Sequence, residues 1–231
     1  MRRRMYLMRH GEAAYFEDDG RPVPPEQAGL TAHGREQALA AGRWLSPIRF
    51  DRVITSGLRR TIETARLVLS EMQNPPEIEQ WPDLRELKGG RLRDIADAEL
   101  EQAFLGAFRG VAPEHTRFLH GETIGSLFDR VLPALQRLLD DAAWDTVLLV
   151  LHGGVNCAVL SYALTGQRLF LGGLAQTPAC INALDVGADW VVRAVNVSPT
   201  DWIHVRGRTT TMEDLLGQYL KYRRGTVNER A

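Results

Sequence analysis

A short apolar run near the start of the chain ends on residues that can do phosphate chemistry. Residues 5–8 are apolar and are followed by Arg9, His10 and Gly11, which is typical of a buried strand that stops at its carboxyl end. Ligands of open α/β sheets bind outside such strand ends. An imidazole there can act as nucleophile or base, and a neighbouring arginine favours an anion, phosphate above all. The motif alone equally fits a strand that simply meets solvent.

Two further strand ends carry residues of the same kind. Residues 51–55 lead into a helix with Arg60 in its first turn, where backbone N–H groups and the helix dipole attract anions. Residues 146–151 are apolar throughout, as expected of a central parallel strand, and stop at His152. If the three strands are neighbours in the sheet, their polar ends converge.

A loop between these strands offers an acid. Glu86 stands between the apolar residues Leu84 and Leu87. Phosphoryl transfer needs a nucleophile, fixed cations for the equatorial oxygens and an acid for the leaving oxygen. Glu86 is the best-placed acid in the sequence.

Composition limits the kinds of protein this chain can be. Its 231 residues, 44% of them hydrophobic, suffice for one core and one domain. The 28 basic and 29 acidic residues leave a net charge of −1, so no overall field points to nucleic acid or to an anionic membrane. No apolar run is long enough to cross a bilayer, and the run after residues 2–4 is too short for a signal peptide. We therefore expect a cytoplasmic protein.

The remaining patterns predict the elements that position these residues. We expect helices over 31–45, 56–69, 94–108, 124–139 and 155–164, an edge strand over 77–81 and a hairpin over 181–195. Thr31 and Ser56 are the expected N-caps of the first two helices.

Three segments surround this framework. Residues 13–29 mix aromatics, acids and prolines, which predicts a loop that can form a lip over the site. Residues 91–120 are expected to form either a cap over the active face or a segment that only packs on the fold and carries solvated charges. Their charged cluster consists of Arg109, His115, Arg117 and His120. From residue 206 onward the chain is polar and basic, which predicts a mobile tail.

Four motifs in this order resemble those of the histidine phosphatase superfamily, the phosphoglycerate mutase-like enzymes. They are Arg-His-Gly-Glu at 9–12, Ser-Gly-Leu-Arg-Arg-Thr at 56–61 with Glu-Thr-Ala at 63–65, Leu-Arg-Glu at 84–86 and Leu-His-Gly-Gly-Val at 151–155. Residues 30–38 also resemble the first helix of that family. The resemblance implies a three-layer α/β/α fold with a mostly parallel central sheet. It implies one domain over 1–231, with a small cap insertion at about 91–120 and a tail at about 206–231.

The resemblance also implies a role for each motif residue. His10 becomes phosphorylated, and Glu86 first protonates the leaving group and then helps to activate water. The implied catalytic residues are His10, Glu86, His152, Arg9 and Arg60, and the implied substrate-binding residues are Arg9, Gly11, Arg60, His152 and Gly153. No metal and no cofactor are implied. Glu12 is expected to orient the site rather than to act as the acid.

The first motif departs from the mutase branch. Mutases usually continue it with Ser or Thr and then a Trp-Asn pair, whereas Ala13 and Phe16 occupy the corresponding places here. The stretch between Glu86 and Gly121 is also short for a mutase, which needs a larger cap to retain a bisphosphorylated intermediate and exclude water. Hydrolysis of a small phosphorylated metabolite is therefore the favoured prediction.

Three other functions stay open at this point. They are a mutase, a catalytically quiet phospho-ligand or protein-binding module, and a phosphatase that acts on phosphohistidine in other proteins. Residues 91–120 would hinder the access of a whole protein substrate.

The sequence gives two conflicting indications of the leaving group. Aromatic residues favour one with some apolar character, namely Tyr15, Phe16, Phe104, Phe108 and Phe118, whereas Arg109 and Arg117 would suit a second anionic group. No catalytic role is expected for His33, His115, His120, His204, Cys157 or Cys180. The sequence leaves monomer and homodimer open.

Overall fold

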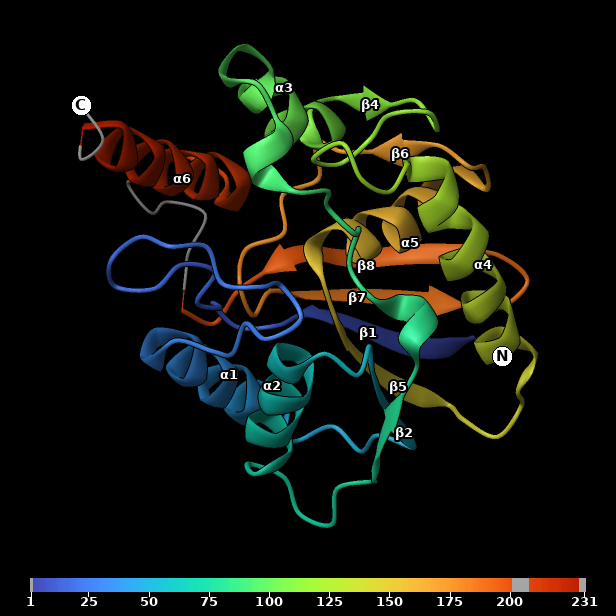
Figure 1. The fold of residues 1–231 in the computed structure, drawn as a ribbon. Coiled ribbons are helices and arrows are strands. Elements are labelled where there is room, and N and C mark those ends of the chain that lie inside the picture. Colours follow the sequence, from blue (N-terminus) through green and yellow to red (C-terminus); the bar gives the residue numbers. More distant parts are fainter. Residues whose placement is uncertain (1, 201–207, 229–231) are drawn as a thin grey trace.

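A six-stranded sheet forms the centre of the computed structural model, which describes residues 2–200 and 208–228, with the backbone alone for 226–228. The strands are β1 (Arg3–Arg9), β2 (Arg52–Thr55), β3 (Ile78–Gln80), β5 (Thr146–Leu151), β7 (Ile181–Val186) and β8 (Trp190–Val197). Their order is β3-β2-β5-β1-β7-β8 (Figure 1). β3, β2, β5 and β1 pair in parallel, and β7 and β8 add an antiparallel hairpin. The expected edge strand and hairpin are both confirmed.

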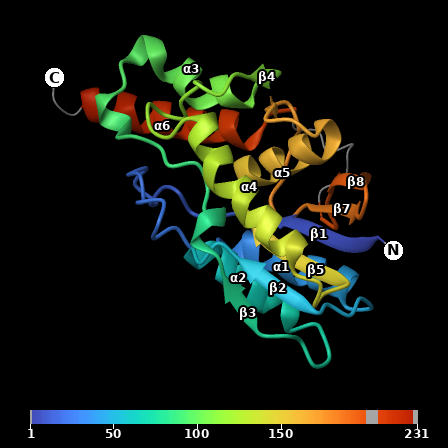
Figure 2. The same cartoon turned by 90° about the vertical axis from the view of Figure 1, so that its right-hand side faces the viewer.

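Two pairs of helices cover the two faces of this sheet. Helices α1 (Ala32–Leu45) and α2 (Arg59–Leu69) pack on one face, and α4 (Ile124–Asp140) and α5 (Gly153–Thr165) pack on the other (Figure 2). Successive residues of β5 alternate between the two cores, with Leu149 on the α4 and α5 side and Leu148 on the α1 and α2 side. The continuous apolar run of β5 is therefore explained, and the predicted three-layer α/β/α fold is confirmed.

The predicted N-cap residue is confirmed for α1 and is wrong for α2. Thr31 caps α1 as expected, because its side chain accepts a hydrogen bond from the N–H of Gly34. α2 begins at Arg59, and its N-cap Leu58 makes no side-chain capping bond. The prediction that Ser56 caps this helix was wrong, because the helix begins three residues later; Ser56 Oγ lies 2.7 Å from His152 Nε2 and accepts from the N–H of Leu58 at 3.4 Å.

The segment over residues 91–120 is built from short turns rather than from the helix expected over 94–108. Its elements are η2 (Leu92–Asp94), η3 (Asp97–Glu99), α3 (Leu100–Leu105), η4 (Gly106–Phe108) and β4 (Val111–Ala112), and η1 (Pro82–Leu84) precedes them. β4 pairs with β6 (Phe170–Leu171) in a separate two-stranded sheet. The α-helix stops at Gly106, in keeping with the low helix propensity of glycine.

The C-terminal segment is a helix, α6 (Thr211–Asn228), where a mobile tail was expected. Leu216 and Tyr219 are buried in a small core that includes Phe104 and Leu105 of α3, and Figure 1 shows α6 beside α3. The prediction was wrong over α6 because one apolar stripe of an otherwise polar segment suffices to pack on α3. Residues 206, 207 and 229–231 of that prediction lie outside the described residues. Within 2–200 and 208–228, no helix has the length and apolarity needed to cross a membrane.

Candidate active site

The carboxyl ends of three neighbouring strands bring the predicted residues together. β2, β5 and β1 are adjacent in the sheet, and Arg9 at the end of β1 is in register with Leu151 at the end of β5. His10 and His152 follow directly, with ring centroids 5.3 Å apart. Arg60 enters from the second position of α2. The sequence made this convergence conditional on strand order, and the observed order meets that condition.

The imidazole of His10 is buried and held in one orientation. His10 Nδ1 lies 2.7 Å from the carbonyl oxygen of Gly11. Because a carbonyl only accepts, Nδ1 carries the proton and Nε2 carries the lone pair. Arg60 Nε donates to that Nε2 at 3.2 Å. Burial, together with the charges of Arg60 and Arg9, lowers the pKa of His10 well below its ordinary value, so the ring is neutral.

Arg9 and Arg60 are buried and each is anchored at one terminal nitrogen. Arg60 Nη1 donates to the carbonyl of Pro25 at 2.6 Å. Arg9 Nη1 donates to the carbonyl of Gln176 and, at 2.9 Å, to Thr211 Oγ1. Arg9 Nε is buried without a hydrogen-bond partner among the described residues. In Arg9 the anchored Nη1 therefore leaves the unpartnered Nε of the planar guanidinium to face an anion. In Arg60 the same anchor at Nη1 turns Nε toward His10.

His152 is also buried, and only one of its ring nitrogens has a partner in the described part of the chain. Nε2 contacts Ser56 Oγ at 2.7 Å, whereas Nδ1 has none. Burial and the charges of Arg60 and Arg9 lower the pKa of His152 well below its ordinary value. Buried polar atoms without partners are rare in native proteins. Nδ1 of His152 and Nε of Arg9 are therefore suited to a polar ligand beside His10.

Glu86 lies at the N-terminus of α5. Its carboxylate oxygens accept hydrogen bonds from the N–H groups of Leu87 and Gly154, each at 3.0 Å. A Cβ at position 154 would lie 2.5 Å from Glu86 Oε1, so the approach depends on glycine. Arg130 of α4 donates to the carbonyls of Arg85 and Glu86 and thereby fixes the loop that carries Glu86.

The two glycines expected in the site differ in their surroundings. The N–H of Gly11 donates to Thr64 Oγ1 at 3.0 Å, and its carbonyl accepts from His10. Gly153 is the first residue of α5, so its N–H has no acceptor within the helix. A Cβ at position 153 would lie 3.7 Å from Arg9 Nε. Gly153 thus borders the cluster, whereas Gly11 braces His10.

Comparison with known proteins identifies the family. The chain matches the model of the histidine phosphatase superfamily (branch 1) over residues 5–198. The chain belongs to this superfamily. The adenosylcobalamin/alpha-ribazole phosphatase of Escherichia coli (strain K12) is 30% identical over 190 residues, which are 79% of this chain and 90% of that protein. The glucosyl-3-phosphoglycerate phosphatase of Mycolicibacterium vanbaalenii is 30% identical over 184 residues, 74% of this chain and 80% of that protein.

Solved structures agree with this assignment. The alpha-ribazole phosphatase from Shigella flexneri superposes with a TM-score of 0.64 at 27% identity, covering 84% of this chain and 96% of that chain. The protein is therefore a phosphatase, a hydrolase of the histidine phosphatase superfamily.

Several residues of this histidine phosphatase's site were indicated only weakly by the sequence or were missed. The Tyr15 hydroxyl lies 3.5 Å from His10 Nε2, and its ring centroid is 5.6 Å from Arg60 Cζ. The sequence indicated Tyr15 only as one of several aromatic residues. Ser56, Arg130, Gln176 and Thr211 were not expected there. Gln176 and Thr211 reach Arg9 across long sequence separations, which no local pattern encodes.

Other residues considered from the sequence have partners elsewhere. Phe104 is buried against Tyr219, and Phe108 and Phe118 stack edge to face at 5.7 Å. Arg109 pairs with Glu101, and Arg117 donates to the carbonyl of Gly121. The exposed histidines are His33, His115 and His120, and His204 lies outside the described residues. Glu12 accepts from Thr31 Oγ1 at the start of α1.

The thiols and the metal-ligating side chains add no second centre. Cys157 and Cys180 are buried, and burial raises the pKa of the Cys157 thiol above its ordinary range and that of Cys180 to about 12. Over residues 2–200 and 208–228, no three His, Cys, Asp or Glu side chains are grouped so that they could hold a metal ion.

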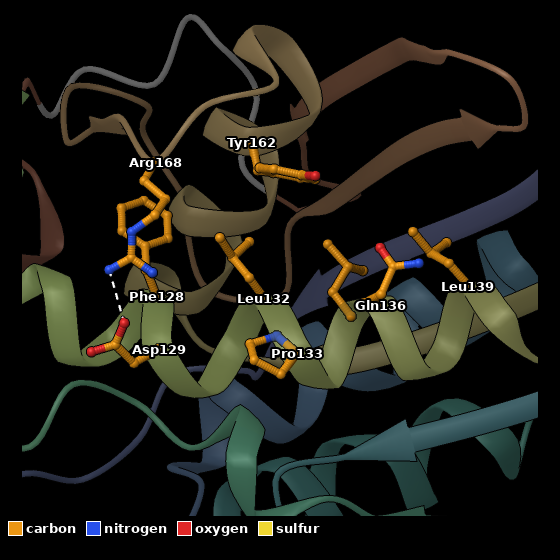
Figure 3. A pocket seen from close by; sticks show the side chains of 9 residues that line it. Phe128, Asp129, Leu132, Pro133, Gln136, Leu139, Tyr162 and Arg168 are labelled. Carbon is orange, nitrogen blue, oxygen red and sulfur yellow. Dashed lines mark ion pairs between the residues drawn. The ribbon is translucent and has the colours of Figure 1, made fainter.

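A groove of about 340 Å³ lies between α4 and the C-terminal half of α5 (Figure 3). Its lining includes Phe128, Leu132, Tyr162 and Arg168, and Arg168 pairs with Asp129 at 2.9 Å. None of the residues around His10 lines this groove.

Proposed function

We propose that this histidine phosphatase hydrolyses a small phosphomonoester through a phosphohistidine intermediate on His10, with Glu86 as general acid and with no metal or cofactor. One observation carries the proposal. The lone pair of the neutral His10 Nε2 lies next to Arg60 Nε at 3.2 Å and shares its buried surroundings with the unpartnered Arg9 Nε and His152 Nδ1. A nucleophile surrounded by fixed donors is what in-line transfer of a phosphoryl group needs.

In the first step His10 Nε2 attacks phosphorus and the ester P–O bond breaks. The proton of Glu86 passes to the leaving oxygen, which departs as an alcohol. The Nε of Arg9, the guanidinium charge of Arg60, His152 and the N–H of Gly153 stabilise the equatorial oxygens. Gly11 acts differently from the substrate-binding role expected of it, because its N–H is used by Thr64, and its carbonyl fixes the His10 tautomer.

In the second step water attacks the phosphohistidine. The carboxylate of Glu86 accepts a proton from the water, the P–N bond breaks, and its electron pair returns to His10 Nε2. Inorganic phosphate leaves, and the proton on Glu86 restores the acid for the next cycle.

The relatives suggest where to look for the substrate. Two of them are called alpha-ribazole phosphatase and glucosyl-3-phosphoglycerate phosphatase, and the chain is about equally similar to both. Both names give a small phosphorylated metabolite as the substrate. We therefore propose a phosphorylated metabolite of that kind, with alpha-ribazole phosphate as the first compound to assay.

The proposal is tested by release of phosphate from p-nitrophenyl phosphate in the presence of a chelator. The parent protein should turn over, and His10→Ala should lose at least about a thousandfold in kcat. His33→Ala is the matched control, since His33 is exposed on α1, and should keep the parent rate. A His10→Ala protein with the parent rate, or a parent protein silenced by the chelator, would contradict the proposal.

A further inference from the structure

We propose that Thr211, the first residue of α6, is a positioning residue of the phosphate site. Its hydroxyl holds the guanidinium of Arg9 in the orientation that turns Nε toward the phosphoryl group. This inference rests on the proposed function, because it assigns part of that same site to the C-terminal helix.

The contact between the two residues is direct. Arg9 Nη1 donates to Thr211 Oγ1 at 2.9 Å and also to the carbonyl of Gln176. The side chain of Arg9 is buried, and its Nε has no partner among the described residues. Two acceptors on one terminal nitrogen fix the plane of the guanidinium, so Nε is left for an anion.

The start of α6 is itself fixed, which gives the Thr211 hydroxyl a defined place. The Glu213 side chain accepts from the N–H of Thr210 at 2.6 Å, and the N–H of Glu213 donates to Thr210 Oγ1 at 3.3 Å. This reciprocal pair is a capping box, which satisfies two N–H groups at the helix start. Thr211 therefore follows a well-defined cap rather than a fraying end.

The rest of α6 is held by residues 91–120. Tyr219 stacks near Phe104 with ring centroids 6.0 Å apart. Arg223 donates to the carbonyl of Ile95 at 2.9 Å and pairs with Asp97 at 2.8 Å. Thr211 thus connects a helix that packs on the 91–120 segment to an arginine at the end of β1.

The experiment uses two substitutions at position 211 and one matched control. Thr211→Val keeps the shape and removes the hydroxyl, Thr211→Ser keeps the hydroxyl, and Thr209→Val makes the same change at an exposed threonine two residues away. Binding of inorganic phosphate is measured by calorimetry, and kcat and KM are measured with p-nitrophenyl phosphate.

We expect Thr211→Val to weaken phosphate binding about tenfold, the order of one hydrogen bond to a charged group. KM should rise by a similar factor while kcat changes less, because ground-state binding of the phosphoryl group is lost first. Thr211→Ser should restore binding to within about twofold, and Thr209→Val should match the parent.

Two results would overturn the inference. One is parent-like phosphate binding by Thr211→Val, and the other is an equal loss in Thr211→Val and Thr211→Ser with lowered melting temperatures, which would make the role of Thr211 purely structural. Arg9→Ala separates the two proposals. If Arg9→Ala binds phosphate like the parent, the proposed site is wrong; if it loses binding while Thr211→Val retains it, only the role of Thr211 is wrong.

Discussion

The hydrogen bond from His10 Nδ1 to the carbonyl of Gly11 decides which ring nitrogen can react. It places the proton on Nδ1 and leaves Nε2 facing Arg60, so the proposed nucleophile and a cation are already in contact. Glu86 is likewise held in place, because its carboxylate accepts hydrogen bonds from the backbone N–H groups of Leu87 and Gly154. Such preorganised groups lower the barrier because they need little rearrangement during the reaction.

The role of Glu86 predicts a dependence on the leaving group. Glu86→Gln should lower kcat/KM about a hundredfold or more for an alkyl phosphate such as phosphoserine, because an alkoxide needs the proton. With p-nitrophenyl phosphate the loss should be closer to about tenfold, since that leaving group needs less help. Steady-state kinetics with both substrates measure this difference. Glu36→Gln, at an exposed carboxylate, is the control, and equal losses with both substrates would exclude Glu86 as the acid.

The two buried histidines predict a loss of stability in acid. The folded-state pKa of His10 and of His152 lies below the unfolded-state value of about 6.5, so the unfolded chain binds protons first as pH falls. Their contribution is complete above about pH 6.5, and each can remove up to about 1.4 kcal/mol per pH unit below it. Urea unfolding between about pH 7 and pH 5 measures this slope. Imidazole NMR signals of either residue that titrate above about pH 6.5 would contradict it.

Sequence reasoning placed the proposed site residues correctly where a strand ends. His10 and His152 directly follow β1 and β5, and Arg60 lies in the first turn of the helix after β2, so an apolar run and its stop indicate these positions. Thr211 and Gln176 could not be found in this way, because their contacts to Arg9 exist only after distant segments pack together. Such residues can be identified from the folded structure but not from local sequence patterns.

At the scale of elements, α6 and α3 form a small core of their own. Tyr219 is 4% exposed and packs near Phe104. Tyr219→Ala should reduce the free energy of unfolding by about 2–5 kcal/mol, as large-to-small changes in a core do. Trp44→Ala on α1 is the control, since Trp44 is 49% exposed and its loss should cost about 0.5 kcal/mol or less. Denaturant unfolding gives both values, and a Tyr219→Ala protein as stable as Trp44→Ala would mean that α6 does not pack as described.

The elements that sequence misjudged share a cause. α6 was mistaken for a tail because its apolar stripe is narrow, and the helix over 94–108 was overextended because α3 stops at Gly106. Ser56 fits an N-cap by type and position, yet its hydroxyl contacts His152. In each case a tertiary contact or a local stop signal outweighed the structure that the local pattern indicated.

At the scale of the whole molecule, the order of β2, β5 and β1 is what makes one site from three distant motifs. Phosphate bound there would contact residues from β1, α2 and the start of α5 together, and so would bind the folded state alone. Inorganic phosphate at one hundred times its Kd should then stabilise the protein by about 2.7 kcal/mol. Thermal unfolding with and without phosphate measures this. Arg60→Ala should lose the gain at the same phosphate concentration, and an unchanged gain in that variant would place the anion elsewhere.

The most direct test of the account is to trap the phosphoenzyme. Glu86→Gln is mixed with p-nitrophenyl phosphate, quenched rapidly in base and digested for mass spectrometry, because removal of the base should slow hydrolysis of the P–N bond more than its formation. We predict one acid-labile phosphoryl group on the peptide that contains His10, and none in the Glu86→Gln protein that also carries His10→Ala. A phosphoryl group on His152 or any other residue, or sustained turnover with no phosphoenzyme at any time point, would contradict the account.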